Sequence, residues 1–250
     1  MSPPLEQIVE GFEINAAGVR DLIDFDRQLL EFSADQMEQL SRSVPQAGLA
    51  QKIQRTADIL RGIRNNDSLK PRFQIIYNQA VVLLVSYFGS TVEDIFKLGV
   101  SQMLNGGATA AALRETELRL TFGDLEERGW ELKESAAELL VEKKDLSFQD
   151  MQAIARAFRE YLEIEVARGP WVDNVILAQA CRHVIVHAGA TATTRMIRQL
   201  RKADLRQLKP KIVVGQKIDF SPDEIVIVET SMLRYIHQLS ASLKDKFTAF

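Results

Sequence analysis

The sequence predicts an all-α protein, and three observations favour that fold class. Apolar residues recur at the three- and four-residue spacing of amphipathic helices along most of the 250 residues. Helix start and stop signals, among them Pro71 and the pair Gly106-Gly107, separate the helical segments. Only residues 212–220 alternate around a glycine, which predicts a small β-hairpin or an extended segment there.

The composition is that of an ordinary globular chain. Hydrophobic residues make up 46% and charged residues 26%, with a formal net charge of -3, which excludes a disordered chain. No uninterrupted apolar run spans a bilayer, and the amino terminus lacks the features of a signal peptide. We therefore expect a cytoplasmic protein outside the membrane. The single cysteine, Cys181, excludes an internal disulfide and is expected to be a packed thiol.

The chain divides into two predicted parts. Residues 1–68 form a helical N-terminal extension, with one or two helices over about 5–42 and another over 49–64. This extension either packs on the rest of the chain or serves as a partner-binding arm. Residues 69–250 form a helical domain, in which Ser147-Phe148-Gln149-Asp150 resembles a capping box. The helices expected in this domain cover residues 71–105, 108–120, 124–141, 148–167, 170–189, 194 onward and 222–246.

One apolar helix carries an unusual group of polar side chains. His183 and His187 lie one helical turn apart and share a face, and the long stem of Arg182 can bring its guanidinium towards that face. The unperturbed pKa of histidine lies nearest neutrality, and the arginine fork fits phosphate oxygens. The combination therefore suits phosphoryl chemistry. The expected core-facing stripe on the opposite side consists of Leu177, Cys181, Val184 and Ala188.

Basic residues gather directly after this helix. Residues 195–211 contain seven Lys or Arg residues against a single Asp. Four of the cations are spaced to lie on one side of a helix, which is either a solvated face or a surface that binds the phosphates of RNA. These four predicted RNA-binding residues are Arg195, Arg198, Arg201 and Lys202.

Two other interpretations of the histidine pair remain. Metal ligation is compatible with the helical spacing, but the only further histidine is the distant His237, and a neighbouring guanidinium opposes a cation. The sequence thus predicts neither a metal site nor a cofactor. In the other interpretation, both histidines are structural residues with hydrogen-bond partners in a helical core.

A resemblance to a known family appears at the same residues. The R-x4-H signature of the HEPN superfamily, with a polar residue after the arginine, is matched by Arg182-His183-Val184-Ile185-Val186-His187. The upstream segment 85–96 is similar to the early core helix of the RiboL-PSP and MAE-type branch. The segment 215–220 before a last helix is similar too. The resemblance covers roughly residues 70–245.

The resemblance implies a HEPN-like helical bundle that acts as a metal-independent endoribonuclease, often a toxin or phage-defence effector. Such domains commonly form homodimers whose R-x4-H helices face one another in a shared cleft, and an antitoxin or defence protein is a possible partner. His187 would transfer protons, Arg182 would neutralise phosphorane charge, and His183 would orient His187 or contact the phosphate. The alternatives are a non-catalytic HEPN-like module that binds a partner protein or nucleotide, and a structural adaptor using residues 1–68.

Overall fold

The computed structural model describes residues 4–63, 70–106, 110–166, 168–201 and 203–248, and it confirms the all-α fold. Within these residues the only β pairing is an isolated bridge between Thr191 and Lys217. The helices are α1 (Leu5–Ser43), α2 (Ala47–Gly62), α3 (Lys70–Gly106), α4 (Ala111–Glu115), α5 (Phe122–Glu127), α6 (Leu132–Lys143), α7 (Met151–Leu162), α8 (Pro170–His187), α9 (Thr194–Leu200) and α10 (Pro222–Thr248).

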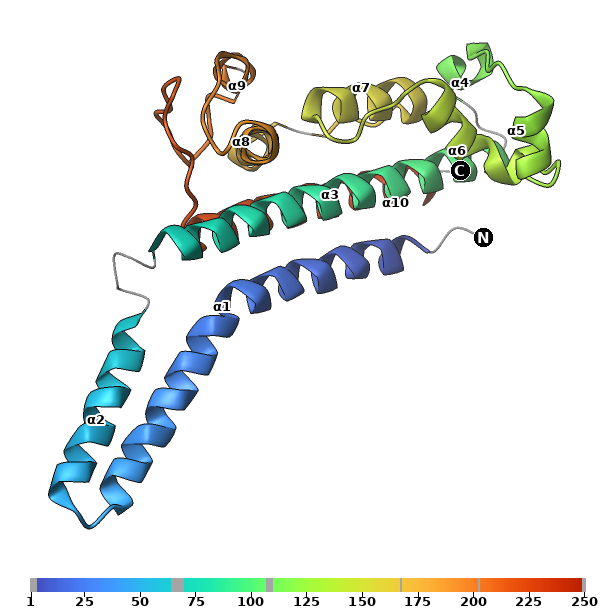
Figure 1. Ribbon diagram of the computed structural model, residues 1–250. Coiled ribbons are helices and arrows are strands. Elements are labelled where there is room, and N and C mark those ends of the chain that lie inside the picture. Colours follow the sequence, from blue (N-terminus) through green and yellow to red (C-terminus); the bar gives the residue numbers. More distant parts are fainter. Residues whose placement is uncertain (1–3, 64–69, 107–109, 167, 202, 249–250) are drawn as a thin grey trace.

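The body of the molecule is built on two long helices, α3 and α10, which run side by side (Figure 1). The amino-terminal half of α1 covers one side of this pair. Helices α7 and α8 cover the opposite side, with α8 running across α3 rather than along it. Helices α3, α7, α8 and α10 and the first half of α1 thereby bury one face or more against a neighbour, as the apolar periodicity requires.

Aromatic side chains join these layers. The ring centroids of Phe12 on α1 and Phe88 on α3 lie 6.5 Å apart, and Phe88 is 5.6 Å from Tyr235 on α10. On the other side of α3, Phe96 meets Phe158 of α7 at 5.4 Å in an edge-to-face arrangement. The core is therefore continuous from α1 to α7, with α3 in the middle.

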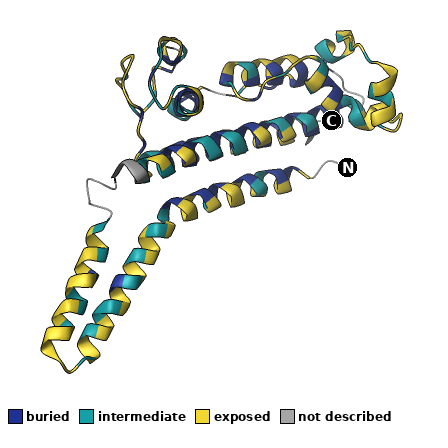
Figure 2. Ribbon diagram, viewed as in Figure 1, coloured by how far each residue is buried: buried dark blue, intermediate teal, exposed yellow. Residues whose placement is uncertain are grey.

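The segment of residues 1–68 contributes to two different parts of the structure. Leu5, Ile8, Phe12, Ala16, Val19 and Ile23 in the first half of α1 are buried in the common core. Beyond Ile23, α1 leaves the body, and α2 returns antiparallel to it as a projecting helical hairpin (Figures 1 and 2). Among the described residues of this hairpin only Ala34 and Ala57 are fully buried.

Helix α3 has the apolar composition of a core helix. By length and composition alone, Phe73–Gly106 could cross a membrane, and it is the only such helix among the described residues. About half of its most apolar window is buried inside the body. The helix packs against α1, α6, α7, α8 and α10, which is compatible with a soluble protein.

Several predicted elements differ from the structure, each for a local reason. The helix predicted at 108–120 is reduced to α4. The helix predicted at 124–141 is interrupted, because Gly129 and Trp130 adopt positive φ values of 58° and 65°. Of the two alternatives predicted for residues 212–220, the extended segment is correct: these residues form an extended loop with a turn at Gly215 (φ 85°).

The predicted start of α7 was also wrong. Its cap is Asp150 rather than Ser147, since the Asp150 carboxylate accepts hydrogen bonds from the backbone N–H groups of Gln152 and Ala153. The helix ends at Glu163, which adopts the left-handed conformation with φ 50°. The predicted end at residue 167 lies outside the described residues.

Candidate active site

Helix α8 is held inside the body almost to its end. All residues from Val172 to Cys181 are buried, and Val184 is buried one turn later. The predicted core-facing stripe is thus buried at Leu177, Cys181 and Val184, while Ala188 follows the last helical residue and is part-buried. Only the final turn reaches the surface, and this turn carries the R-x4-H residues.

Buried polar side chains of α8 fasten the segments around it. The carboxylate of Asp173 accepts a hydrogen bond of 2.8 Å from the backbone N–H of Leu205. Asn174 accepts one of 3.0 Å from the Gln207 N–H and donates one of 3.1 Å to Ser231 on α10. These contacts fix α8 against α10 and against the loop after α9. Sequence reasoning missed their role, although polar residues within an apolar helix were a visible signal.

The extended loop at 212–220 secures the end of α8. Gly189 and Ala190 turn the chain with positive φ values of 55° and 58°. The Ala190 carbonyl accepts a hydrogen bond of 2.8 Å from the Ile218 N–H, and the Gly189 carbonyl accepts one of 2.6 Å from the Lys217 ammonium. The last turn of α8 therefore sits on a fixed scaffold.

The two histidines of the motif lie next to each other. The ring centroids of His183 and His187 are 4.9 Å apart, with an angle of 52° between the ring planes. His183 is part-buried, whereas His187 is exposed at the end of the helix. Arg182 is also part-buried, and its buried Nε atom has no hydrogen-bond partner in the described part of the chain. An arginine whose side chain is only part-buried beside two imidazoles is suited to an anionic ligand.

The electrostatic environment of His183 is positive. Burial lowers the pKa of His183, and the charges of Arg195, His187 and Arg182 lower it further. His183 is therefore neutral at pH 7 and can accept a hydrogen bond or a proton there. Arg182 and Arg195 form a local positive field, which attracts phosphate.

Three of the four predicted RNA-binding residues are described, and all three are exposed. Arg195 and Arg198 lie on α9, whose first turn is capped by the Thr193 hydroxyl, and Arg201 is the C-cap residue. Arg195 is close enough for its charge to act on His183. Lys202 lies outside the described residues. Helix α9 is thus a short basic element beside the histidine pair.

Two other cations of the basic segment are not available for a ligand. The guanidinium of Arg206 donates to the backbone carbonyls of Leu200, Ala203, Lys209 and Pro210. The ammonium of Lys209 binds the Glu224 carboxylate at 2.9 Å and the Asp219 carbonyl. Both side chains therefore stabilise the loop between α9 and α10. Fewer basic side chains are free to bind a ligand than the number of Lys and Arg residues in this segment suggests.

The remaining candidates take other roles. Cys181 is fully buried, and burial raises the pKa of its thiol to about 12, as expected for a packed thiol. The third histidine, His237, lies on α10, where its Nε2 is 3.2 Å from the Glu13 carboxylate on α1. In the described part of the chain no three His, Cys, Asp or Glu residues are grouped so that they could hold a metal ion.

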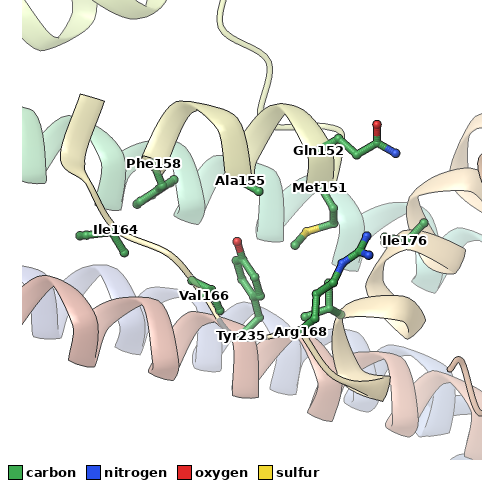
Figure 3. Close-up of a pocket in the computed structure, with 10 residues that line it drawn as sticks. Met151, Gln152, Ala155, Phe158, Ile164, Val166, Arg168, Ile176 and Tyr235 are labelled. Atoms are coloured by element: carbon green, nitrogen blue, oxygen red, sulfur yellow. The ribbon is translucent and has the colours of Figure 1, made fainter. Parts of the chain in front are cut away.

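Two cavities lie elsewhere in the body. One, of about 100 Å³, is lined mainly by apolar residues of α7, of α8 and of the segment that joins them, with Tyr235 of α10 in the middle of this group (Figure 3). The other, of about 480 Å³, is lined by Trp171 and by Arg234, whose guanidinium lies 3.8 Å from the indole centroid. Neither is lined by the R-x4-H residues, of which His187 is exposed and Arg182 and His183 are part-buried.

No family model matches the chain, and comparisons with curated proteins and with solved structures give no match either. The resemblance to the HEPN superfamily therefore stays a prediction. It is carried by Arg182, His183 and His187 in an apolar helix of an all-helical domain, and by the segments at 85–96 and 215–220.

Proposed function

We propose that the chain is a metal-independent endoribonuclease whose active site is the last turn of α8. The observation that carries the proposal is the pair of imidazoles, 4.9 Å apart, beside the part-buried guanidinium of Arg182. Proton transfer groups and a fixed cation are the two requirements for cleaving a phosphodiester without a metal. The exposed position of His187 leaves room for a substrate as large as RNA.

The reaction uses the 2′-hydroxyl of RNA as its nucleophile. The 2′ oxygen attacks the adjacent phosphorus while His187 takes the hydroxyl proton, and Arg182 neutralises the charge that develops on the phosphorane oxygens. The bond from phosphorus to the 5′ oxygen then breaks, and this oxygen takes a proton. The products are a 2′,3′-cyclic phosphate and a 5′-hydroxyl. DNA lacks the nucleophile and is not cut.

His183 and α9 have supporting roles in this proposal. Neutral His183 orients the His187 ring or donates to the phosphate, because its lowered pKa keeps it uncharged at pH 7. Arg195, Arg198 and Arg201 bind the flanking phosphates, which position the RNA without reading its sequence.

A second copy of the chain completes the site. One exposed imidazole cannot both remove the 2′ proton and donate to the 5′ oxygen at the same moment, so two His187 residues facing one another in a shared cleft supply both transfers. A cytoplasmic toxin or phage-defence effector, held in check by an antitoxin or defence protein, is the biological role that fits such an activity.

Cleavage of labelled single-stranded RNA in excess EDTA tests the proposal. The purified wild type should leave a 2′,3′-cyclic phosphate, and His187→Ala and Arg182→Ala should each lose at least about a hundredfold in rate. His237→Ala is the matched control, because this histidine is also exposed but lies away from the motif on α10. It should cut at the wild-type rate.

The substrate control is the same RNA with 2′-deoxynucleotides at the cleaved positions, which should remain intact. If folded wild type leaves several RNAs uncut, or if His187→Ala cuts as fast as His237→Ala, the ribonuclease assignment fails. The chain is then better explained as a non-catalytic module that binds a partner protein or nucleotide through the same part of α8.

A further inference from the structure

The hairpin that projects from the body, residues 24–62, is here called the arm. It consists of the second half of α1 and all of α2, and it extends away from the helices of the core (Figure 1). A two-helix hairpin has little interior of its own, and most of the arm is exposed or part-buried (Figure 2). The arm therefore differs from α3, α8 and α10, which bury most of their apolar residues.

Large apolar side chains are exposed along the arm and at its base, with relative exposures from 46% to 65%. On α1 the first four are spaced by three, four and three residues, which is the heptad pattern of a helix that packs against another. The exposed set is Leu22, Phe25, Leu29, Phe32 and Leu40 on α1, with Leu49 and Ile59 on α2.

The apolar residues of the two helices face the same side of the arm. At about 100° per residue, the Phe25, Leu29 and Phe32 stripe lies about 120° from the stripe of α1 that faces α2. On α2, Leu49 and Leu60 lie about 70° from Ala57, the residue that faces α1. The two helices run antiparallel, so rotations in the same sense along each chain turn both sets of apolar residues towards the same side of the arm. Ile59 lies at the edge of this common face.

The opposite face of the arm is polar, and ion pairs on this face connect α2 to α1. Arg61 on α2 reaches across to Asp35 at 2.9 Å and to Glu38 at 2.7 Å, both on α1. Arg42 adds a further pair with Glu38 at 2.6 Å. The arm is thus an amphipathic two-helix layer, which is half of a four-helix bundle.

The size of the apolar face matches a protein interface. The seven exposed side chains together offer on the order of 700 Å² of surface per protomer, close to the roughly 800 Å² that each partner buries in a stable interface of standard size. A patch of this size is larger than a monomeric protein normally leaves in water.

We propose that the arm is a homodimerisation element, in which the arms of two copies of this chain stack through their apolar faces as a four-helix bundle. A two-fold axis places identical faces against each other, so the heptad of α1 packs on the partner arm and the Arg61 ion pairs remain in solvent. In this proposal the arms supply the affinity that holds the two copies together, and the facing α8 helices of the proposed function add little to it. The arm interface therefore does not rest on the ribonuclease proposal.

The test is the mass of the full-length protein in solution, measured by sedimentation equilibrium over a range of concentrations. The wild type should have the mass of two chains. The double variant Phe25→Ser/Phe32→Ser should raise the dimer dissociation constant by about a hundredfold or more, because two central apolar anchors are lost. Both side chains are exposed in the protomer, so the circular dichroism of the variant should match the wild type.

Ile14→Ser is the matched control. Ile14 is 64% exposed, as much as Phe25, but it lies on the half of α1 that packs on the body. This variant should remain dimeric. A wild type that is monomeric at every concentration, or a folded double variant that dimerises as tightly as Ile14→Ser, would overturn the proposal. Because the measurement uses no RNA, its result is independent of whether the α8 site cleaves RNA.

Discussion

Arg20 on α1 and Glu229 on α10 form an ion pair of 3.2 Å whose partners differ greatly in exposure. The side chain of Arg20 is 52% exposed, whereas that of Glu229 is only 4% exposed. Burial raises the pKa of Glu229, and the charge of Arg20 opposes this rise. The charge of Arg20 therefore offsets part of the cost of burying the Glu229 carboxylate. The pair joins α1 to α10 just before the arm begins.

We expect Arg20→Ala to destabilise the fold by about 1–2 kcal/mol at pH 7.5, because it leaves the Glu229 carboxylate buried without its partner. The raised pKa means that folded Glu229 keeps its proton to a higher pH than the unfolded chain does. The contribution of protonated Glu229 to the free energy of unfolding is thus complete below pH 4.5, and it is lost as the pH rises through the pKa of Glu229 in the folded protein.

The loss of unfolding free energy in Arg20→Ala relative to wild type should therefore become smaller as the pH falls towards 4.5. Urea unfolding at several pH values measures this. The double variant Arg20→Ala/Glu229→Gln is the control, because it has no buried charge and should recover most of the lost stability. A deficit that is equal at pH 5 and pH 7.5 would contradict the explanation.

The charge of Arg195 should hold down the pKa of His183. Only three histidines are present, so their ring protons give few signals in an NMR titration and can be assigned by single substitutions. In wild type His183 should titrate below its ordinary value, and Arg195→Ala should move its pKa upward. Arg55→Ala, on the exposed surface of α2, should leave it unchanged. A His183 signal that is indifferent to Arg195 would show that α9 does not act on the histidine pair.

The sequence was sufficient to predict the elements with strong local signals. The predicted helix that carries the motif and the predicted last helix begin where expected, because Pro170 stands at the first position of α8 and Ser221 and Glu224 form a reciprocal cap at the start of α10. The buried stripe on α8 followed from spacing alone. In these places local capping and apolar periodicity agree with the tertiary packing.

Tertiary contacts decided the rest. Asp150 caps α7, and its other carboxylate oxygen lies 3.4 Å from the Gln199 amide of α9, a contact that no local pattern reveals. The roles of Arg206 and Lys209 depend on carbonyls and a carboxylate that folding brings to them. A count of charges along the sequence cannot separate such structural cations from those, such as Arg198, that remain exposed.

RNA binding should show which cations of α9 touch phosphate. In an inactive His187→Ala background, log affinity for single-stranded RNA should fall linearly with log salt concentration. Arg195→Ala and Arg198→Ala should each reduce the steepness of that line by about 0.7. Arg55→Ala carries the same charge change on the arm and should leave the slope as it was. Fluorescence anisotropy across a salt series measures the slopes, and equal slopes for all three variants would remove α9 from the RNA surface.

Gly99 of α3 should be required for the close packing of α3 against its neighbours. A Cβ atom at this position would lie 2.8 Å from a methyl carbon of Leu162 and 2.9 Å from one of Leu243, both fully buried. We expect Gly99→Ala to destabilise the fold by about 1–3 kcal/mol, since the core must shift to accept the methyl group.

Gly18→Ala makes the same chemical change within another helix. A Cβ at Gly18 meets nothing within 4 Å, so alanine should stabilise α1 by about 0.5–1 kcal/mol through its better helix propensity. Thermal and urea unfolding of the two variants should therefore move in opposite directions from the wild type. If Gly99→Ala proved as stable as Gly18→Ala, the close approach of α7 and α10 to α3 at this point would not hold in solution.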